Sequence, residues 1–361
     1  MSVLKSRPVL RWLVPVAAVT TVVGGGAAIG TFAAQAEPSL PPRSAAQLLV
    51  DLQTSRLEGL SGTVVQRADL GLPPLAGLVA GDDLTGLLTG THTLRVWHSG
   101  PDRQRIALLD TLGEQDIIRN GRDVWTWSSR TNTATHRTLP AGEGEAAPAE
   151  LPATPQEAAD RALAAIDPST EVSVGRSATV AGRDAYELVL APRDAASLVH
   201  QVRIAIDARE HVPLRFEVFA DGSDQPAFEM AFTQVSYARP DADQFTFNPP
   251  PGVTVTEEPA GERPAGPRRP EGERPQLRTV GEGWATVVVA RLDGAGAPSA
   301  GAGRAPTGDA ATLLGSLPAV SGDWGSGRLL TGKLFSVLLT DDGRLLAGAV
   351  TPERLYQVAT G

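Results

Sequence analysis

Residues 202–232 read VRIAIDAREHVPLRFEVFADGSDQPAFEMAF, and this stretch decides the fold of the larger part of the chain. Apolar side chains recur at every second position in three successive runs, with polar or charged side chains between them. The apolar set is Val202, Ile204, Ile206, Leu214, Phe216, Val218, Phe228, Met230 and Phe232. A period of two is typical of β-strands with one buried and one solvated face. The stretch predicts an antiparallel meander whose apolar face must be covered by helices or by a ligand.

Shorter runs upstream have the same period and extend the predicted sheet toward the N-terminus. They are Thr63–Arg67, Thr93–His98, Arg103–Leu109, Gln115–Arg119 and Asp123–Trp127. Two capping boxes predict helices: Ser44 with Gln47 opens one that should stop at Gly59, and Thr154 with Glu157 opens a second. We therefore expect one α+β domain over residues 40–256.

A change of composition divides the chain after this domain. Residues 257–280 are rich in Pro, Gly, Glu and Arg, and have too few apolar side chains to offset the entropy cost of ordering, so we interpret them as a linker. A small C-terminal domain is expected over residues 281–361, folding independently of the first. Its predicted elements are strands at Trp284–Leu292, Lys333–Thr340 and Leu345–Val350 and a helix capped by Thr351-Pro352.

The first 36 residues have the pattern of an export segment. Lys5, Arg7 and Arg11 precede an uncharged run, which ends in the small-x-small pattern Ala34-Gln35-Ala36. The segment can be a cleaved signal peptide or an uncleaved membrane anchor, because the uncharged run is also long enough to span a bilayer. Both interpretations place residues from 37 onward outside the cytoplasm, in the periplasm, in the cell envelope or in the medium.

Composition and motifs exclude several functions. The net charge of -9 and the pI near 5.2 argue against a nucleic-acid partner, and the absence of cysteine excludes disulfides, thiolate metal sites and a cysteine nucleophile. Gly327–Lys333 has the phosphate-loop spacing, but Leu334 stands where that motif needs Ser or Thr. His92 and His98 are the only close pair of histidines, and we expect them to be solvated or hydrogen-bonded. We therefore predict no catalytic residue, no metal ligand, no cofactor and no enzyme activity.

The apolar residues that could bind a ligand form the candidate site. The insertion at residues 68–91 is rich in leucines, which predicts a hydrophobic flap over the sheet, although a loop that only packs on the core is the alternative. Trp125 and Trp127 lie two apart on one strand and share a face, for ligand lining or for core packing. The candidate cavity residues are Trp125, Trp127, Phe216, Phe228, Met230, Phe232, Leu75, Leu84 and Leu87.

Three stretches of the predicted domain resemble a known family. They are Leu60–Gln66 (LSGTVVQ), residues 118–135 with IRNGRDVWTW and TNTAT, and residues 245–255 (FTFNPPPGVTV). Over about residues 40–256 the chain resembles the LolA-type outer-membrane lipoprotein carriers. The resemblance implies an incomplete antiparallel β-barrel, or half-barrel, wrapped around helices, with an apolar cavity for acyl chains.

The chain departs from the carriers at two points. Their conserved latch arginine precedes the proline that aligns with Pro101, but Gly100 stands there in this chain, so the resemblance does not extend to their release switch. The second departure is the extra C-terminal domain, which resembles the small α/β domain of RseB-type regulators. The resemblance thus implies a carrier for acyl chains of a lipoprotein or lipid, or alternatively an RseB-like envelope-stress sensor that regulates an anti-sigma factor or another membrane protein.

Overall fold

The computed structural model describes residues 38–55, 57–72, 89–110, 113–140, 154–156, 159, 163, 166–258, 277–291 and 316–361. The predicted export segment, the flap leucines Leu75, Leu84 and Leu87, and the middle of the predicted linker lie outside these residues. Neither helix described below, nor any other helical part of these ranges, has the length and hydropathy that a membrane crossing requires.

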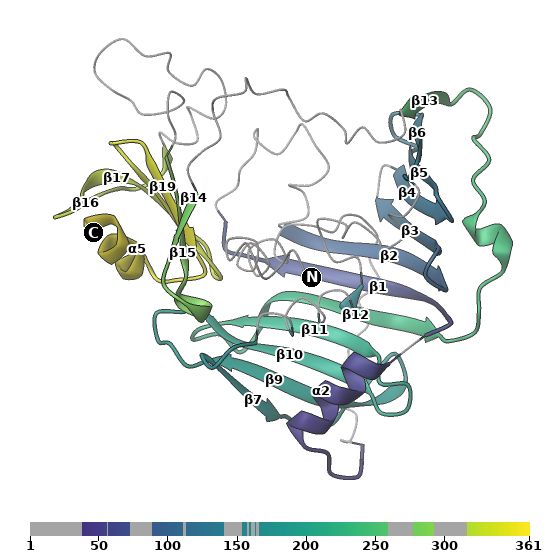
Figure 1. Cartoon of the computed structure of the whole chain (residues 1–361), viewed down its shortest axis with the longest axis horizontal. Helices are drawn as coiled ribbons and strands as arrows, with labels where there is room; N and C mark the ends of the chain where they lie inside the picture. Colours follow the sequence, from purple (N-terminus) through teal and green to yellow (C-terminus); the bar gives the residue numbers. More distant parts are fainter. Residues whose placement is uncertain are drawn as a thin grey trace.

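Thirteen strands form one large sheet (Figure 1). They are β1 (Gly59–Asp69), β2 (Thr89–Ser99), β3 (Arg103–Asp110), β4 (Gly113–Asn120), β5 (Asp123–Ser128), β6 (Thr133–Thr138), β7 (Thr170–Val174), β8 (Ala178–Val180), β9 (Arg183–Pro192), β10 (Val199–Asp207), β11 (Pro213–Ala220), β12 (Pro226–Ser236) and β13 (Thr254–Glu258). Their order is β13-β6-β5-β4-β3-β2-β1-β12-β11-β10-β9-β7, with β8 beside β9. This path has two ends that do not meet, so the sheet stays open, in agreement with a half-barrel.

The strand register confirms the predicted meander. Phe216 lies opposite Ile204 of β10 and Met230 of β12, and Val218 lies opposite Val202 and Phe228. All these side chains are buried on one face, which we call the inner face. Most of the sheet is antiparallel, but β13 pairs with β6 in parallel after the chain has passed through the short helix η3 (Ala242–Phe245).

Helix α2 (Ala45–Thr54) covers part of the inner face. The capping box of Ser44 and Gln47 is present, and Leu48 and Leu52 are buried among the inner-face side chains. The helix ends at Thr54 and not near Gly59 as predicted, because Ser55 leaves helical geometry (ψ 131°) and Gly59 already begins β1. Residues of the second predicted helix, Ala159 among them, pack on the same core. Beyond these contacts, wrapping of the sheet around helices stays a prediction.

In the part of the chain that the structure describes, the C-terminal unit is a six-stranded sheet with helix α5 beside it. Its order is β14-β15-β19-β18-β17-β16, and every described pair is antiparallel. The bounds are β14 (Leu277–Val280), β15 (Val287–Arg291), β16 (Ala319–Gly322), β17 (Gly325–Thr331), β18 (Ser336–Thr340), β19 (Arg344–Gly348) and α5 (Pro352–Thr360). This antiparallel arrangement is of the α+β type, so the α/β class that the resemblance to RseB-type regulators implies for this domain is not confirmed. Gly327–Thr331, the first part of the phosphate-loop match, lies within strand β17.

The two sheets pack against each other. Leu334 and Trp284 are buried in the core of the large sheet, where the Trp284 indole N–H donates to Thr170 Oγ1 at 2.9 Å. The backbone N–H of Lys333 donates to the carbonyl oxygen of Leu70 at 2.7 Å. We call this contact region the joint. It shows that the two units are not merely tethered, which the linker composition did not indicate.

The strands also reach into both ends of the predicted linker. Strand β13 continues to Glu258, and β14 begins at Leu277. Residues 257–258 and 277–280 are therefore strand residues and not linker.

Candidate ligand-binding cavity

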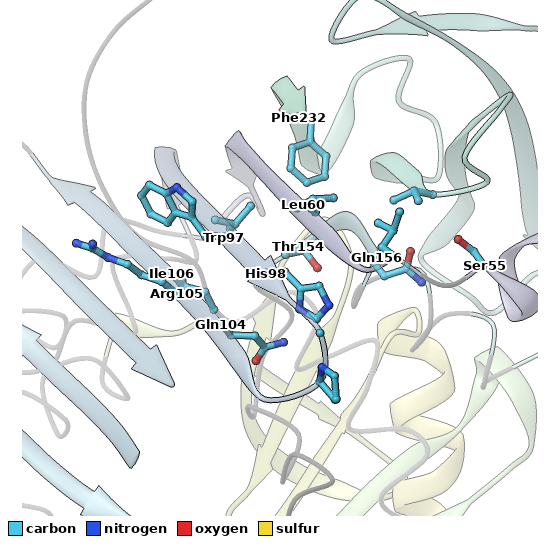
Figure 2. Close-up of a pocket in the computed structure, with 15 residues that line it drawn as sticks. Ser55, Leu60, Trp97, His98, Gln104, Arg105, Ile106, Thr154, Gln156 and Phe232 are labelled. Atoms are coloured by element: carbon cyan, nitrogen blue, oxygen red, sulfur yellow. The ribbon is translucent and has the colours of Figure 1, made fainter. Parts of the chain in front are cut away.

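A cavity of about 430 Å³ lies on the inner face where β1 begins, β2 ends and β3 begins (Figure 2). Its volume falls within the range of roughly 300–1,000 Å³ that is typical of small-molecule sites. The apolar lining residues include Leu57, Leu60, Val96, Ile106, Val212 and Phe232. The polar lining residues that face the cavity are Ser55, His98, Gln104, Thr154 and Gln156.

Strand register brings the central lining residues together. His98 lies opposite Leu60 of β1 and Gln104 of β3, and Val96 lies opposite Ile106 two positions further on. Residues that are opposite or two apart project from the same face of a sheet. Three neighbouring strands therefore make one continuous wall. Ser55 after α2, Thr154 and the helical residue Gln156 complete the lining.

Gly62 shapes this wall because it has no side chain. A Cβ atom at Gly62 would lie 2.8 Å from the Phe232 ring and 2.5 Å from the carbonyl oxygen of Gln234, closer than carbon atoms tolerate. Glycine therefore lets the Phe232 ring lie against β1 at the edge of the cavity. Gly62 belongs to the stretch that carries the family resemblance.

His98 is a half-buried polar group of the cavity. Burial lowers the pKa of its imidazole, although a hydrogen bond to the backbone of Leu57 acts in the opposite direction. The ring is therefore neutral at neutral pH. A neutral imidazole that donates one N–H to a carbonyl oxygen keeps its other nitrogen as an acceptor.

Arg105 contributes no charge to the cavity, although it is a lining residue. Its guanidinium binds Asp116 at 2.5 Å and lies 5.2 Å from the centre of the Trp97 ring. Both partners alternate with the inner-face residues and so lie on the opposite face of the sheet. Burial raises the pKa of the Asp116 carboxyl, and Arg105 partly opposes this shift. The charge of Arg105 is thus directed away from the cavity, as Figure 2 shows.

The structure brings together only part of the candidate cavity set. Phe232 lines the cavity, whereas Phe216, Phe228 and Met230 share its face but are buried side chains of the core. For these three residues, core packing is the interpretation that the structure supports. Leu75, Leu84 and Leu87 lie outside the described residues.

Trp125 and Trp127 share a face, as predicted, but it is the face opposite the cavity. Trp125 lies across from Ile118, which lies across from Arg105, so its side chain points outward with that of Arg105. Its ring stacks on His136 with the centroids 4.3 Å apart, and both tryptophans contact Phe247. The two tryptophans therefore do not line the cavity that the structure describes.

Sequence reasoning did not select His98, Gln104, Leu60, Val96 or Ile106 as site residues. The signal was present, because Leu94, Val96 and His98 alternate on one predicted strand. It was not decisive, since the same alternation describes ordinary core strands. The expectation that His98 is hydrogen-bonded is confirmed by its interaction with Leu57.

An open, mostly antiparallel sheet with an apolar cavity on its inner face is consistent with a half-barrel. Residues 89–250 match the family model of the MucB/RseB N-terminal domain. This match supports a LolA/LolB/RseB-like superfamily for the domain, which the resemblance of residues 118–135 and 245–255 predicted. The match supports a binding protein or a regulator of the RseB type.

Solved structures give weaker similarities. The MucA/MucB complex of Pseudomonas aeruginosa has a chain that is 18% identical, with 87% of this chain and 96% of that chain covered and a TM-score of 0.44. A crystal structure of MucB is 19% identical over 87% of this chain and 96% of that chain, with a TM-score of 0.38. A LolA superfamily protein from Nitrosomonas europaea is 12% identical over 57% and 99%, with a TM-score of 0.22. The search of curated proteins found no match.

Proposed function

We propose that this chain is an extracytoplasmic binding or carrier protein that holds acyl chains of a lipoprotein or lipid in its half-barrel cavity. The observation that carries the proposal is the cavity of about 430 Å³ with Leu60, Val96 and Phe232 in its wall. The export pattern of residues 1–36 and the superfamily of residues 89–250 support it.

Binding would follow from burial alone. Each CH₂ group that leaves water for an apolar wall contributes about 0.8 kcal/mol, so a chain that fills the cavity can be held without a covalent bond or a cofactor. The wall is already formed by paired strands, which limits the entropy lost on binding. No enzyme activity is part of this proposal.

An RseB-like regulator is the second candidate. Strand β1 connects the cavity, at Leu60, with the joint, where Leu70 accepts a hydrogen bond from Lys333 of the C-terminal unit. A ligand at one end of this strand could change the contact of the whole chain with a membrane protein. MucB, whose structures include a complex with MucA, is the relative that favours this alternative.

Filling the cavity tests the proposal. Ile106→Trp would place an indole in the cavity and should abolish binding of a fluorescent fatty-acyl probe, while circular dichroism confirms the fold. The matched control is Ile117→Trp, because Ile117 lies directly across from Ile106 on the same face, is 46% exposed and does not line the cavity. Equal probe affinity of the two variants and the wild-type protein would refute binding in this cavity.

A further inference from the structure

The cavity is divided into an apolar end and a polar end. Figure 2 shows Leu60 and Phe232 toward one end and His98 and Gln104 toward the other. The polar lining residues come from separate segments: Ser55 follows α2, His98 and Gln104 belong to β2 and β3, Thr154 stands just before a helical turn, and Gln156 lies in that turn. Such a convergence of polar groups on an apolar space can orient a ligand.

The polar groups are also uncharged. Ser, Thr and Gln have no charge at any ordinary pH, and the His98 imidazole is neutral at neutral pH because burial lowers its pKa. The charge of Arg105 is bound to Asp116 on the opposite face of the sheet. Among the described lining residues, none directs an ammonium, guanidinium or carboxylate group into the cavity. Arg119 lies opposite Gln104 on the same face but is not a lining residue, and its guanidinium donates to the carbonyl oxygen of Gly121.

Neutral polar groups distinguish between ligands of different charge. An anionic head group that enters an apolar site without a cation loses its hydration and gains no compensating ion pair. Proteins that bind carboxylates or phosphates supply arginine or lysine for this reason. A hydroxyl, ester or amide group loses less hydration, and glutamine amides can both donate to it and accept from it.

The positions of His98 and Gln104 suit a neutral group. The two residues lie directly opposite each other on neighbouring antiparallel strands, so their side chains project from the same face at close range. The imidazole supplies an acceptor nitrogen, and the amide supplies both donors and an acceptor. A ligand hydroxyl between them can donate to His98 and accept from Gln104.

We propose that this cavity selects neutral amphiphiles, in which an alkyl chain ends in a hydroxyl, ester or amide group, over anionic amphiphiles of equal chain length. The inference rests on the proposed function, because it assigns a specificity to the same cavity. The apolar wall takes the chain, and the cluster of His98, Gln104, Thr154 and Gln156 takes the neutral head group.

A matched pair of ligands tests the selectivity. Monododecanoylglycerol and dodecanoate have the same acyl chain but a neutral and an anionic head, and calorimetric titration of the full chain at about pH 8 keeps the carboxylate ionised. The glyceride should bind about tenfold or more tightly than dodecanoate, the ratio that 1.4 kcal/mol gives. Equal affinities, or tighter binding of dodecanoate, would overturn this inference alone. Binding of neither ligand would overturn the proposed function and this inference with it.

Substitutions locate the selectivity in the polar end. Gln104→Lys adds a cation beside the head group and should reverse the preference toward dodecanoate, whereas Gln104→Leu should weaken only glyceride binding. The control is Gln225→Leu, at an exposed position between β11 and β12, which should leave both affinities unchanged. An unaltered ratio of affinities in Gln104→Lys, with the fold intact, would contradict the inference.

Discussion

Replacing Glu217 by Gln should stabilise the protein at pH 8 and change its stability little at pH 4. Glu217 lies on the outer face of β11 and is only 8% exposed. It lies opposite Glu229 on β12 and Arg203 on β10, and its carboxylate is 3.1 Å from the Arg215 guanidinium. Arg215 is shared with Glu187 at 3.4 Å, so its charge does not balance Glu217 alone.

Burial dominates the ionisation of this carboxyl. It raises the pKa of Glu217 from 4.5 to about 7, with Arg215 opposing the shift and the carboxylates of Glu229 and Glu187 adding to it. The ion pair with Arg215 alone would lower the pKa of Glu217, but the loss of hydration and two nearby carboxylates outweigh the guanidinium groups of Arg215 and Arg203.

The magnitude follows from the difference between the folded and unfolded pKa values. The rise of the Glu217 pKa from 4.5 to about 7 corresponds to about 3 kcal/mol of unfolding free energy, since each pKa unit corresponds to about 1.4 kcal/mol. A raised pKa means that the folded state holds the proton more tightly. The protonated Glu217 carboxyl therefore contributes its full stabilisation of the folded state below about pH 4.5, and this contribution is lost as the pH rises through 7.

Urea denaturation of the wild-type protein and Glu217→Gln across this pH range measures the effect. The variant should gain up to about 3 kcal/mol relative to the wild-type protein at pH 8, because an amide cannot ionise. The two proteins should differ little at pH 4, where the carboxyl is protonated, so the acidic end of the series is the internal control. A constant difference in unfolding free energy from pH 4 to pH 8 would refute the argument.

Two further predictions concern the joint and the export segment. Leu334→Ala should lower the unfolding free energy by about 2–5 kcal/mol, because Leu334 is 2% exposed in the core of the large sheet, whereas Leu277→Ala, at a position that is 51% exposed, should have little effect on the urea midpoint. Protease added to intact spheroplasts should digest the chain beyond residue 37, as the pattern of residues 1–36 predicts, and protection of the chain would contradict export.

The sheet could be predicted from the sequence because its signal is local. The alternation over residues 202–232 is read within each strand, and the short turns between the strands limit the pairing to antiparallel neighbours. The predicted end of helix α2 was wrong for an equally local reason. Leu57 and Gly59 continue the apolar texture of the helix, and nothing in their composition shows that the chain has already turned toward β1.

The cavity could not be predicted in the same way, because it depends on relations between distant strands. Strands β4, β3, β2 and β1 lie between β5, which holds Trp127, and β12, which holds Phe232. Whether the two side chains share a face depends on the register of each successive strand pair, and on the register shift between Thr63 and Val64. A change of one residue in any register reverses the answer. Likewise, Phe228 and Phe232 have the same alternation in the sequence, and only packing shows that Phe228 is covered and Phe232 borders the cavity.

A carrier and a regulator differ in whether the affinity of the cavity for its ligand depends on the joint. Leu60 at the cavity lies in β1, and Leu70 at the joint directly follows this strand. The two are ten residues apart, roughly 33 Å at the rise of an extended strand. Coupling between two sites is reciprocal, so a ligand that changes the joint must bind with an affinity that depends on the joint. In a simple carrier, Leu334→Ala should therefore lower stability without changing the affinity of the folded protein for the acyl probe. In a regulator, the same variant should change that affinity, because the ligand would bind more tightly to the protein in one arrangement of the joint than in the other.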